Sequence, residues 1–242
     1  TPPVAEVQPK TFVGFDQQGV DNYYWMRDKT DPKVIDYLNA DKAYTETVMS
    51  STSDLQEKIY NEILGRMKED DESYPTLRNG YYYYSRTEAG KEYATHCRRK
   101  GSMEAPEEII FDLNEMGEGK SAFIFRGYSV SPDNSKAAYF YNETGSFAEF
   151  KLHIKDLASG EDVGFSIDGA TSVAWANDSK TLFFGVIDET LRSYQIRRQM
   201  LDADESTLVY QEDDAKFSSY FSTSKRRDYI FIESSSSTTS EE

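Results

Sequence analysis

The sequence predicts a mainly β protein in which an N-terminal helical extension precedes the first blades of a β-propeller. Three observations lead to this prediction: a hairpin pattern that occurs three times, a change from four-residue to two-residue periodicity near Asp71, and a high tyrosine content. Aromatic residues make up 14% of the chain, and 18 residues are tyrosine. Tyrosine is favoured on the pleated, half-buried surface of a sheet, so the composition agrees with the pattern.

The hairpin pattern occurs at residues 128–141, again at 172–184 and, more weakly, at 219–231. Each copy has a short apolar strand, a turn rich in Asp, Asn, Ser or Pro, and a second strand of aromatic and β-branched residues. Lys136, Lys180 and Lys225 align the copies at a spacing of about 45 residues, which is typical of propeller blades built from four-stranded sheets. A β-sandwich in which two hairpins resemble each other by chance is the alternative.

Residues 1–72 are predicted to form an N-terminal arm with two helices. Residues 1 to about 20 are interpreted as an irregular, extended lead-in. An aromatic cluster follows at residues 21–28, in which we expect Trp25 to be buried with Tyr23 or Tyr24 beside it, because a terminal segment is ordered only when something holds it.

Both helices have recognisable start signals. Asp31-Pro32 combines a capping side chain with the residue that fits the first helical position, which predicts a helix from residue 32 to about 50. Ser53 and Gln56 have capping-box spacing, which predicts a second helix at 53–68. Its apolar stripe recurs every four residues, at Leu55, Ile59, Ile63 and Met67.

Residues 73–242 are predicted to form three blades and the start of a fourth. The first blade contains Asn79-Gly80, a strong turn signal, and ends near Leu113. The second runs from about Phe123 to Ile167, the third from about Thr171 to Glu212, and the fourth begins at Phe217. Closed propellers need four to eight blades, so we expect this sequence to be the front portion of a longer protein. Because it begins with Thr1, we also expect an N-terminal piece before it.

Composition excludes several classes of function. A formal charge of −16 argues against nucleic acid as a partner and permits attraction of basic peptides. Cys97 is the one cysteine, so neither an intrachain disulfide nor a cysteine-based metal cluster can form. No apolar run reaches the length of a membrane span. We therefore expect no membrane partner and no cofactor.

No segment contains a recognisable active site. Gly127-Tyr-Ser-Val-Ser131 lacks the second glycine of a nucleophile elbow and lies inside the hairpin repeat, so we interpret it as a strand. His96 and His153 both lie in the middle of predicted strands, and neighbouring strand residues such as His96 and Cys97 point to opposite faces. Metalloprotease, Walker and dinucleotide motifs are missing. Catalytic, cofactor-binding and metal-binding residues are therefore all predicted as none.

Two glycosylation acceptor patterns, Asn142-Glu-Thr144 and Asn177-Asp-Ser179, fall where propeller turns are expected in any case. We interpret them as turn residues.

The order of the parts resembles a known family. Tyr23-Tyr-Trp-Met-Arg-Asp28, two helices and a propeller that starts at Gly80-Tyr-Tyr-Tyr-Tyr84 are similar to the prolyl oligopeptidase family of serine peptidases. Within it, the sequence resembles the oligopeptidase B group, also called protease II, from about residue 10 to the end. That closer resemblance is carried by Trp25–Asp28, Gly90–Tyr93 with His96–Lys100, Val173–Asp178 and Thr238–Ser240.

The resemblance implies an α/β-hydrolase domain with a Ser-Asp-His triad, capped by a seven-bladed propeller that gates substrate access. It implies hydrolysis of short peptides after Arg or Lys. The partners it implies are short basic peptides and the protein's own C-terminal hydrolase domain. That catalytic domain is expected downstream and absent from these residues, so no triad member is assigned.

Two hypotheses for function follow. The first is the N-terminal and propeller region of a serine oligopeptidase, in the cytoplasm or periplasm of a bacterium with the cytoplasm favoured. The second is a non-catalytic propeller that binds a protein or peptide partner.

Overall fold

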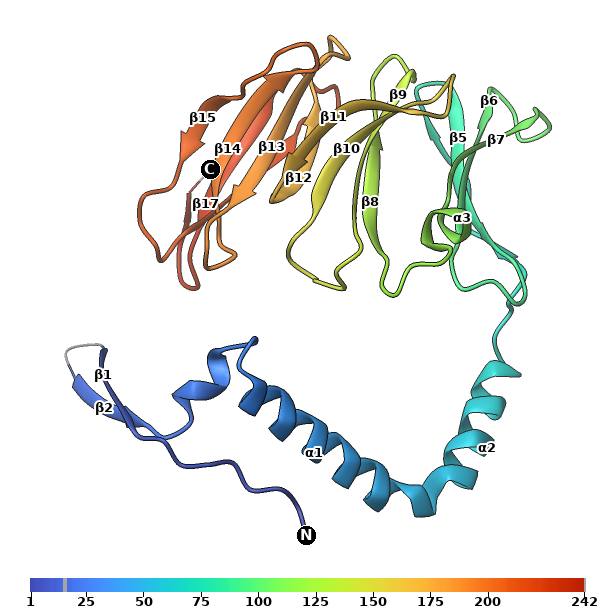
Figure 1. Ribbon diagram of the computed structural model, residues 1–242. Coiled ribbons are helices and arrows are strands. Elements are labelled where there is room, and N and C mark those ends of the chain that lie inside the picture. The colour runs from blue at the N-terminus through green and yellow to red at the C-terminus, as the bar shows by residue number, and fades with distance from the viewer. Residues whose placement is uncertain (15–16, 242) are drawn as a thin grey trace. The chain divides into compact units, whose positions relative to one another are not determined.

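The computed structural model describes residues 1–14 and 17–241 (Figure 1). The chain divides into two compact units, Thr1–Lys68 and Glu69–Glu242. We describe each unit by itself. The elements of the first unit are β1 (Lys10–Gly14), β2 (Gln17–Asp21), the 3-10 helix η1 (Tyr24–Arg27), α1 (Pro32–Met49), the 3-10 helix η2 (Ser50–Thr52) and α2 (Ser53–Leu64).

The predicted irregular lead-in is wrong, because β1 and β2 form an antiparallel hairpin. Phe12 pairs with Gly19 across the hairpin. A Cβ atom at Gly19 would lie 2.7 Å from the ring of Phe12, so the glycine makes room for the aromatic side chain. Gly19 therefore supports this hairpin, although a glycine in sequence suggests a loop.

The helix prediction is confirmed for α1 and needs two corrections for α2. The side chain of Asp31 accepts a hydrogen bond of 2.9 Å from the amide of Lys33, and Pro32 takes the first position. In α2 the N-cap is Thr52, and Gln56 Nε2 donates to its hydroxyl at 2.8 Å. Ser53 is already helical, because η2 continues from α1 without an extended residue between them. The helix ends at Leu64 rather than at residue 68, with Gly65 as its C-cap.

Trp25 is half-buried, which corrects the expectation of a buried side chain. Its indole Nε1 donates to the carbonyl oxygen of Glu6 at 3.0 Å, so it still holds the preceding segment. Tyr23 is 45% exposed, and the ring of Tyr24 carries the ammonium group of Lys10 at 3.4 Å. A hairpin and a single turn of helix offer too little apolar surface to enclose an indole.

The second unit is a series of antiparallel sheets, as predicted. Figure 1 shows them side by side, from β5–β7 at one end to β15 and β17 at the other. Each sheet is a meander of consecutive strands rather than one of two facing layers, which decides against a sandwich. The first sheet holds β3 (Asp71–Glu72), β4 (Thr76–Arg78), β5 (Tyr81–Thr87), β6 (Thr95–Lys100) and β7 (Glu107–Asp112), and the short helix α3 (Leu113–Gly117) follows it. The second holds β8 (Ile124–Val130), β9 (Lys136–Asn142), β10 (Lys151–Asp156) and β11 (Asp162–Asp168); the third holds β12 (Ala170–Trp175), β13 (Thr181–Ile187), β14 (Ser193–Met200) and β15 (Thr207–Gln211); the fourth holds β16 (Ser218–Thr223), β17 (Ile230–Ser235) and β18 (Ser240–Glu241).

The three repeated hairpins share one geometry, but the lysines do not align them. In each turn, the backbone amide of the first residue donates to the carbonyl oxygen of the residue five positions later. Its own carbonyl oxygen accepts from the amide of the residue three positions later, called the third residue here because it is the third group in this pattern. These first residues are Ser131, Ala176 and Ser224. The third residue has a positive φ in every copy: Asn134 (63°), Ser179 (56°) and Arg227 (61°). Lys136 therefore matches Thr181 and Tyr229 rather than Lys180 and Lys225, so the lysine alignment is wrong in the third and fourth blades.

Neighbouring turns are also joined across blades. Asn134 Nδ2 donates to Asn79 O at 3.1 Å, and Asn177 Nδ2 donates to Arg227 O at 3.1 Å. The amide of Asp133 donates to Ser179 Oγ at 3.1 Å. The Asn and Ser residues of the repeat thus connect each hairpin to the next one as well as shaping its own turn.

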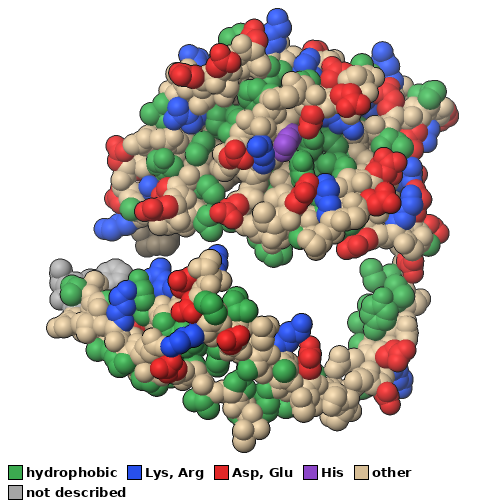
Figure 2. All heavy atoms as spheres, in the orientation of Figure 1, with side chains coloured by type: hydrophobic (Ala, Val, Ile, Leu, Met, Phe, Trp, Pro, Cys, Tyr) green, Lys and Arg blue, Asp and Glu red, His purple; other side chains and the backbone are tan. Residues whose placement is uncertain are grey.

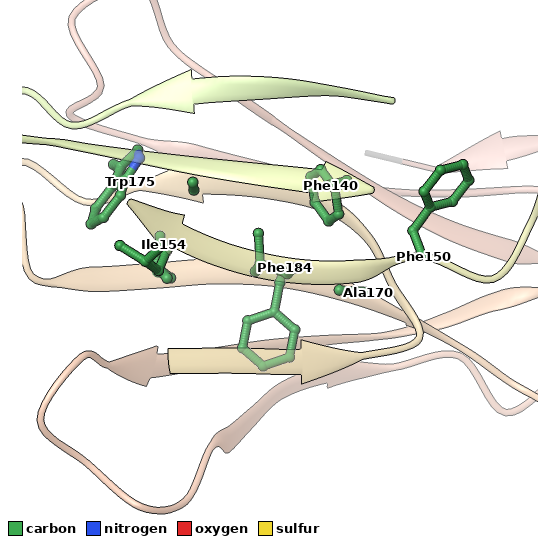
Figure 3. Packing of buried hydrophobic residues seen from close by; sticks show 9 residues of the cluster. Phe140, Phe150, Ile154, Ala170, Trp175 and Phe184 are labelled. Atoms are coloured by element: carbon green, nitrogen blue, oxygen red, sulfur yellow. The ribbon is translucent and has the colours of Figure 1, made fainter. Parts of the chain in front are cut away.

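The core lies between blades, and β9 contributes to two parts of it. Successive strand residues point to opposite faces. Ala138 and Phe140 face the third blade, whereas Ala137 and Tyr139 face the first. Figure 3 shows the cluster between the second and third blades, where Phe140 and Ile154 from one sheet meet Trp175 and Phe184 from the other.

Candidate functional site

The inner strand of the first blade is interrupted, and this break creates the site. β3 pairs with the end of β5 and β4 pairs with its beginning, so the middle of β5 has no continuous neighbour. Pro75 lies in the gap and has no amide to contribute. Ser73 partly replaces the missing strand: its amide donates to Ser85 O at 2.8 Å, and its hydroxyl accepts from Ser85 N at 2.9 Å.

A cavity of about 340 Å³ lies beside this break. It extends from the gap to β8, the inner strand of the second blade, and to the turn between β16 and β17. Its volume lies within the range of pockets that hold small ligands. The residues that line it are Ser73, Tyr74, Thr76, Arg78, Asn79, Tyr83, Tyr84, Ser85, His96, Tyr128, Ser129, Val130 and Arg227.

The charged side chains that line the cavity are both cationic, Arg78 and Arg227. Among the described residues, neither Arg78 nor Arg227 forms an ion pair. Burial raises the pKa of Tyr128 to about 12, so its hydroxyl stays protonated. Burial lowers the pKa of His96, which favours the neutral imidazole at pH 7. The cavity can therefore hydrogen-bond and neutralise an anionic group.

The two histidines are held by aromatic rings. His96 lies 5.6 Å from the ring of Phe125 and 5.2 Å from that of Tyr128. His153 is stacked on Tyr141 at 4.8 Å, and its Nδ1 lies 3.6 Å from Asp162 Oδ2. Burial lowers the pKa of His153 as well, and Asp162 partly opposes that shift. Within residues 1–14 and 17–241, no serine or cysteine side chain is hydrogen-bonded to either histidine.

Known proteins with similar sequences identify the family of this chain. Residues 2–242 match the family model described as prolyl oligopeptidase, N-terminal beta-propeller domain. The chain belongs to the prolyl oligopeptidase family. It is 34% identical over 233 residues to dipeptidyl aminopeptidase BI of Pseudoxanthomonas mexicana, and 29% identical over 231 residues to protease 2 of Moraxella lacunata. These matches cover 88% and 91% of the chain but 32% and 33% of the relatives, so the chain spans about a third of their length.

Solved structures of the same family share the fold. Oligopeptidase B from Leishmania major superposes with a TM-score of 0.91 at 26% identity, over 97% of this chain and 36% of the other. Oligopeptidase B from Trypanosoma brucei gives 0.88 at 25% identity, with the same coverage. The predicted oligopeptidase-like propeller, preceded by helices, is thus confirmed as the fold.

Ser129 and Ser131, in the segment that partly matches a nucleophile elbow, have structural roles in the propeller. Gly127 and Ser129 belong to β8, as predicted. Ser129 O accepts the indole hydrogen bond of Trp175 at 2.9 Å. Ser131 is fully buried, donates to Asp133 Oδ1 at 2.6 Å and accepts from Lys136 N at 2.9 Å. These bonds hold the turn that connects β8 and β9.

Cys97 lies on the opposite face of β6 from His96, as the strand geometry predicted. Its side chain is fully buried. Burial raises the pKa of the thiol to about 11, with Glu107 adding to the shift and Arg86 opposing it. The thiol is therefore protonated at neutral pH and is a poor nucleophile.

Both glycosylation patterns are occupied by structural contacts. Asn142 is buried, donates to Ser146 O at 2.6 Å and accepts from the amide of Gly145 at 3.1 Å. Asn177 bonds the neighbouring turn. In the described part of the chain, no group of three or more His, Cys, Asp or Glu side chains could hold a metal ion, and no helix is long and apolar enough to cross a membrane.

Local sequence patterns did not identify the cavity. Arg78 and Arg227 come from the first and fourth blades, and no pattern near either residue connects them. The single available signal was Pro75, because proline has no amide to donate to a sheet and marks an edge strand or a break.

Proposed function

We propose that this chain is the N-terminal and propeller region of a serine oligopeptidase similar to oligopeptidase B, which hydrolyses short peptides after Arg or Lys. The observation that carries this proposal is the TM-score of 0.91 with oligopeptidase B from Leishmania major over nearly the whole chain. The match to protease 2 of Moraxella lacunata supports the same group.

The catalytic step is proposed to take place on an α/β-hydrolase domain outside these residues. Peptide hydrolysis in the family needs an activated serine, a histidine base and oxyanion donors in one place. The two histidines here are packed against aromatic rings, which supports assigning the triad elsewhere. The propeller would gate substrate access by admitting short peptides and excluding folded proteins.

Exposed apolar side chains on this chain support the proposal that a further domain and further blades cover them in the whole protein. Leu55, Ile59 and Ile63 are 47–57% exposed along α2, where Figure 2 shows hydrophobic side chains gathered, and Met67, three residues beyond the helix end, is 63% exposed. A helix stripe of this kind is normally covered, and we propose that the hydrolase domain covers it. Ile109 on the first sheet is 53% exposed, which agrees with an additional blade beside β7.

A second candidate is removal of dipeptides from free N-termini, because the 34% identical relative is named dipeptidyl aminopeptidase BI. The two activities differ in their need for a free amine. The test is hydrolysis by the whole gene product of a chromogenic dibasic peptide with its N-terminus either acetylated or free. Cleavage of the acetylated peptide supports the oligopeptidase, whereas cleavage confined to the free peptide supports the aminopeptidase.

Failure to cleave either peptide, together with no labelling by a serine-reactive phosphonate, would favour the remaining alternative, a non-catalytic propeller that binds a protein or peptide partner. Purified residues 1–242 serve as the matched control and are expected to show neither activity. Activity of that fragment after rigorous removal of host peptidases would contradict the assignment of the chemistry to another domain.

The charge of −16 would assist capture of basic peptides. Figure 2 shows acidic and basic side chains interspersed on the visible face of the propeller unit, so we expect a modest effect. Raising the salt concentration should slow capture, since exposed charges are screened over about 10 Å at 0.1 M. We place the protein in the cytoplasm or periplasm of a bacterium, with the cytoplasm favoured, and cell fractionation tests this.

A further inference from the structure

The cavity beside β4 differs in charge from the rest of the chain. The protein has 43 acidic residues, yet none of the residues that line this cavity is acidic. Two of them are arginines. A concave site lined by two arginines and no carboxylate offers a local positive potential.

Four other arginines of the propeller unit, Arg86, Arg98, Arg99 and Arg192, form ion pairs with described carboxylates. Arg98 bonds Glu108 at 2.7 Å and Arg192 bonds Asp188 at 2.9 Å, while Arg86 bonds Glu107 at 3.3 Å. Arg78 and Arg227 form no ion pair with any described residue, although both line the cavity. A guanidinium group has a planar fork of donors that matches a carboxylate. These two are therefore available for a carboxylate from outside the chain.

The backbone at Arg227 supports a role for its side chain. Its φ of 61° is shared by the equivalent turn residues Asn134 and Ser179. Asn tolerates this conformation well, whereas a long side chain is uncommon there. The turn geometry alone does not explain an arginine at this position, but a need for its charge in the cavity would.

Additional lining groups suit a peptide end. The Tyr128 hydroxyl can donate a hydrogen bond, and the rings of Tyr83 and Tyr128 with Val130 supply apolar walls for a neighbouring side chain. The break at Pro75 opens the inner strand at this level, so an extended segment could lie between β4 and β8.

We propose that this cavity binds a carboxylate group of a peptide, held by Arg78 and Arg227. The proposal rests on the proposed action on peptides and names a part of the ligand that the acidic charge of the protein would not attract. A carboxylate comes from the free C-terminus of a peptide or from an Asp or Glu side chain. Short peptides always bring a terminal carboxylate close to their other binding groups, so a site of this kind would favour them over long chains.

The experiment measures binding by calorimetry to the whole gene product with three probes. These are acetylated Ala-Ala-Phe with a free carboxylate, the same peptide as an amide, and acetylated Ala-Asp-Phe amide. None contains Arg or Lys, so binding is measured without the expected cleavage. The free carboxylate should bind about tenfold tighter than its amide, the size expected for one charge-assisted contact. The aspartyl amide separates the two sources: tight binding of that probe assigns the site to side chains as well as termini.

Arg78→Gln and Arg227→Gln should each remove most of this preference and leave the affinity of the amide unchanged. Arg226→Gln is the matched control, because Arg226 is exposed in the same turn and does not line the cavity. Thermal unfolding of each variant checks the fold, and Arg227→Gln lies on a surface turn, where folding is least at risk.

Equal binding of the carboxylate and amide probes, absence of binding by all three, or an equal loss in Arg226→Gln would overturn the proposal. The hydrolysis assay is read separately. Loss of the carboxylate preference would leave the proposed peptidase intact, and a missing peptidase activity would leave the binding result standing.

Discussion

The two interfaces that flank the second blade differ in chemistry, although β9 contributes to both. Between the second and third blades the buried residues of the cluster are aliphatic or aromatic, including Leu152, Ile154, Leu182 and Phe184, each at most 1% exposed. Between the first and second blades the side chains are mainly aromatic and titratable, with Phe111 at 4.7 Å from Tyr139 and both histidines on the same side.

The two interfaces should therefore respond to different perturbations. The stability of a close-packed apolar interface depends on side-chain volume, and such an interface carries no charge that pH could change. The interface between the first and second blades, called the first interface below, contains imidazoles, phenols and the buried Arg98, whose guanidinium donates to Asn134 O at 2.9 Å. It also borders the cavity. We therefore expect changes in side-chain volume to alter stability mainly at the second interface, between the second and third blades. Changes in pH or in polar groups should alter it mainly at the first interface.

The largest expected effect is the loss of a buried ring between the second and third blades. Phe184 is 1% exposed, and Phe184→Ala should lower the free energy of unfolding by about 3–5 kcal/mol, because it removes apolar burial and leaves a void. Urea denaturation followed by circular dichroism measures this. Leu208→Ala on the outer strand, 45% exposed, is the control and should cost less than about 1 kcal/mol. Similar losses in both variants would show that this interface is not the main source of stability.

Much of this arrangement could be predicted from sequence because each blade announces itself locally. Asn79-Gly80 and the Asp/Asn turns located the hairpins, and the second blade was expected at 123–167 and observed at Ile124–Asp168. Ala137, Ala138, Tyr139 and Phe140 are consecutive in β9, so both faces of the strand are apolar, which is typical of a strand buried on both sides.

What could not be predicted depends on contacts distant in sequence. The hairpin around Gly19 depends on a cross-strand ring, and the half-burial of Trp25 depends on how little surface surrounds it. The cavity needs a broken strand in one blade and a turn in another. Lysine positions misaligned the repeats because the conserved geometry lies in the backbone bonds and positive φ values rather than in a residue type.

Trp175→Phe tests the hydrogen bond that accompanies the apolar packing between the second and third blades. Trp175 is 3% exposed, and its Nε1 donates to Ser129 O at 2.9 Å across the blades. The change keeps a ring but leaves a carbonyl oxygen without this partner, so we expect a loss of about 2 kcal/mol in the free energy of unfolding. Denaturant titration measures the loss. An unchanged midpoint would mean that water or another donor replaces the indole.

The pH dependence should come from the first interface. Burial lowers the pKa of His96 and His153 below their usual 6.5, so the folded state favours neutral imidazole. The resulting stability is complete above pH 6.5 and is lost as the pH falls through the lowered folded-state pKa, with a slope below about 1.4 kcal/mol per pH unit for each proton. The hydroxyl of Tyr84 is the chief cause of the lowered pKa of Glu107. The stability that this carboxylate contributes is complete above pH 4.5 and is lost only at lower pH.

Unfolding free energies measured at several values between pH 5 and 7 provide the check. His96→Gln and His153→Gln together should flatten the dependence in this window. Phe184→Ala should lower stability equally at every pH. A slope that persists without both histidines would place the titrating group elsewhere.

The smallest effect is expected from Tyr139→Phe, which deletes one polar group from the first interface as Trp175→Phe does from the second. The Tyr139 hydroxyl lies 3.0 Å from both carboxylate oxygens of Asp162. Asp162 is 43% exposed at its side chain, so water can replace the lost donor. The ring remains stacked on Tyr141 and keeps its apolar contacts. We expect a loss of about 0.5 kcal/mol or less in the free energy of unfolding, measured in the same titration. Because burial and Asp162 raise the pKa of Tyr139, its hydroxyl is neutral throughout the accessible range, and the effect should not vary with pH. A loss as large as that of Trp175→Phe would mean that the polar interface is as tightly packed as the apolar one, and would remove the distinction between them.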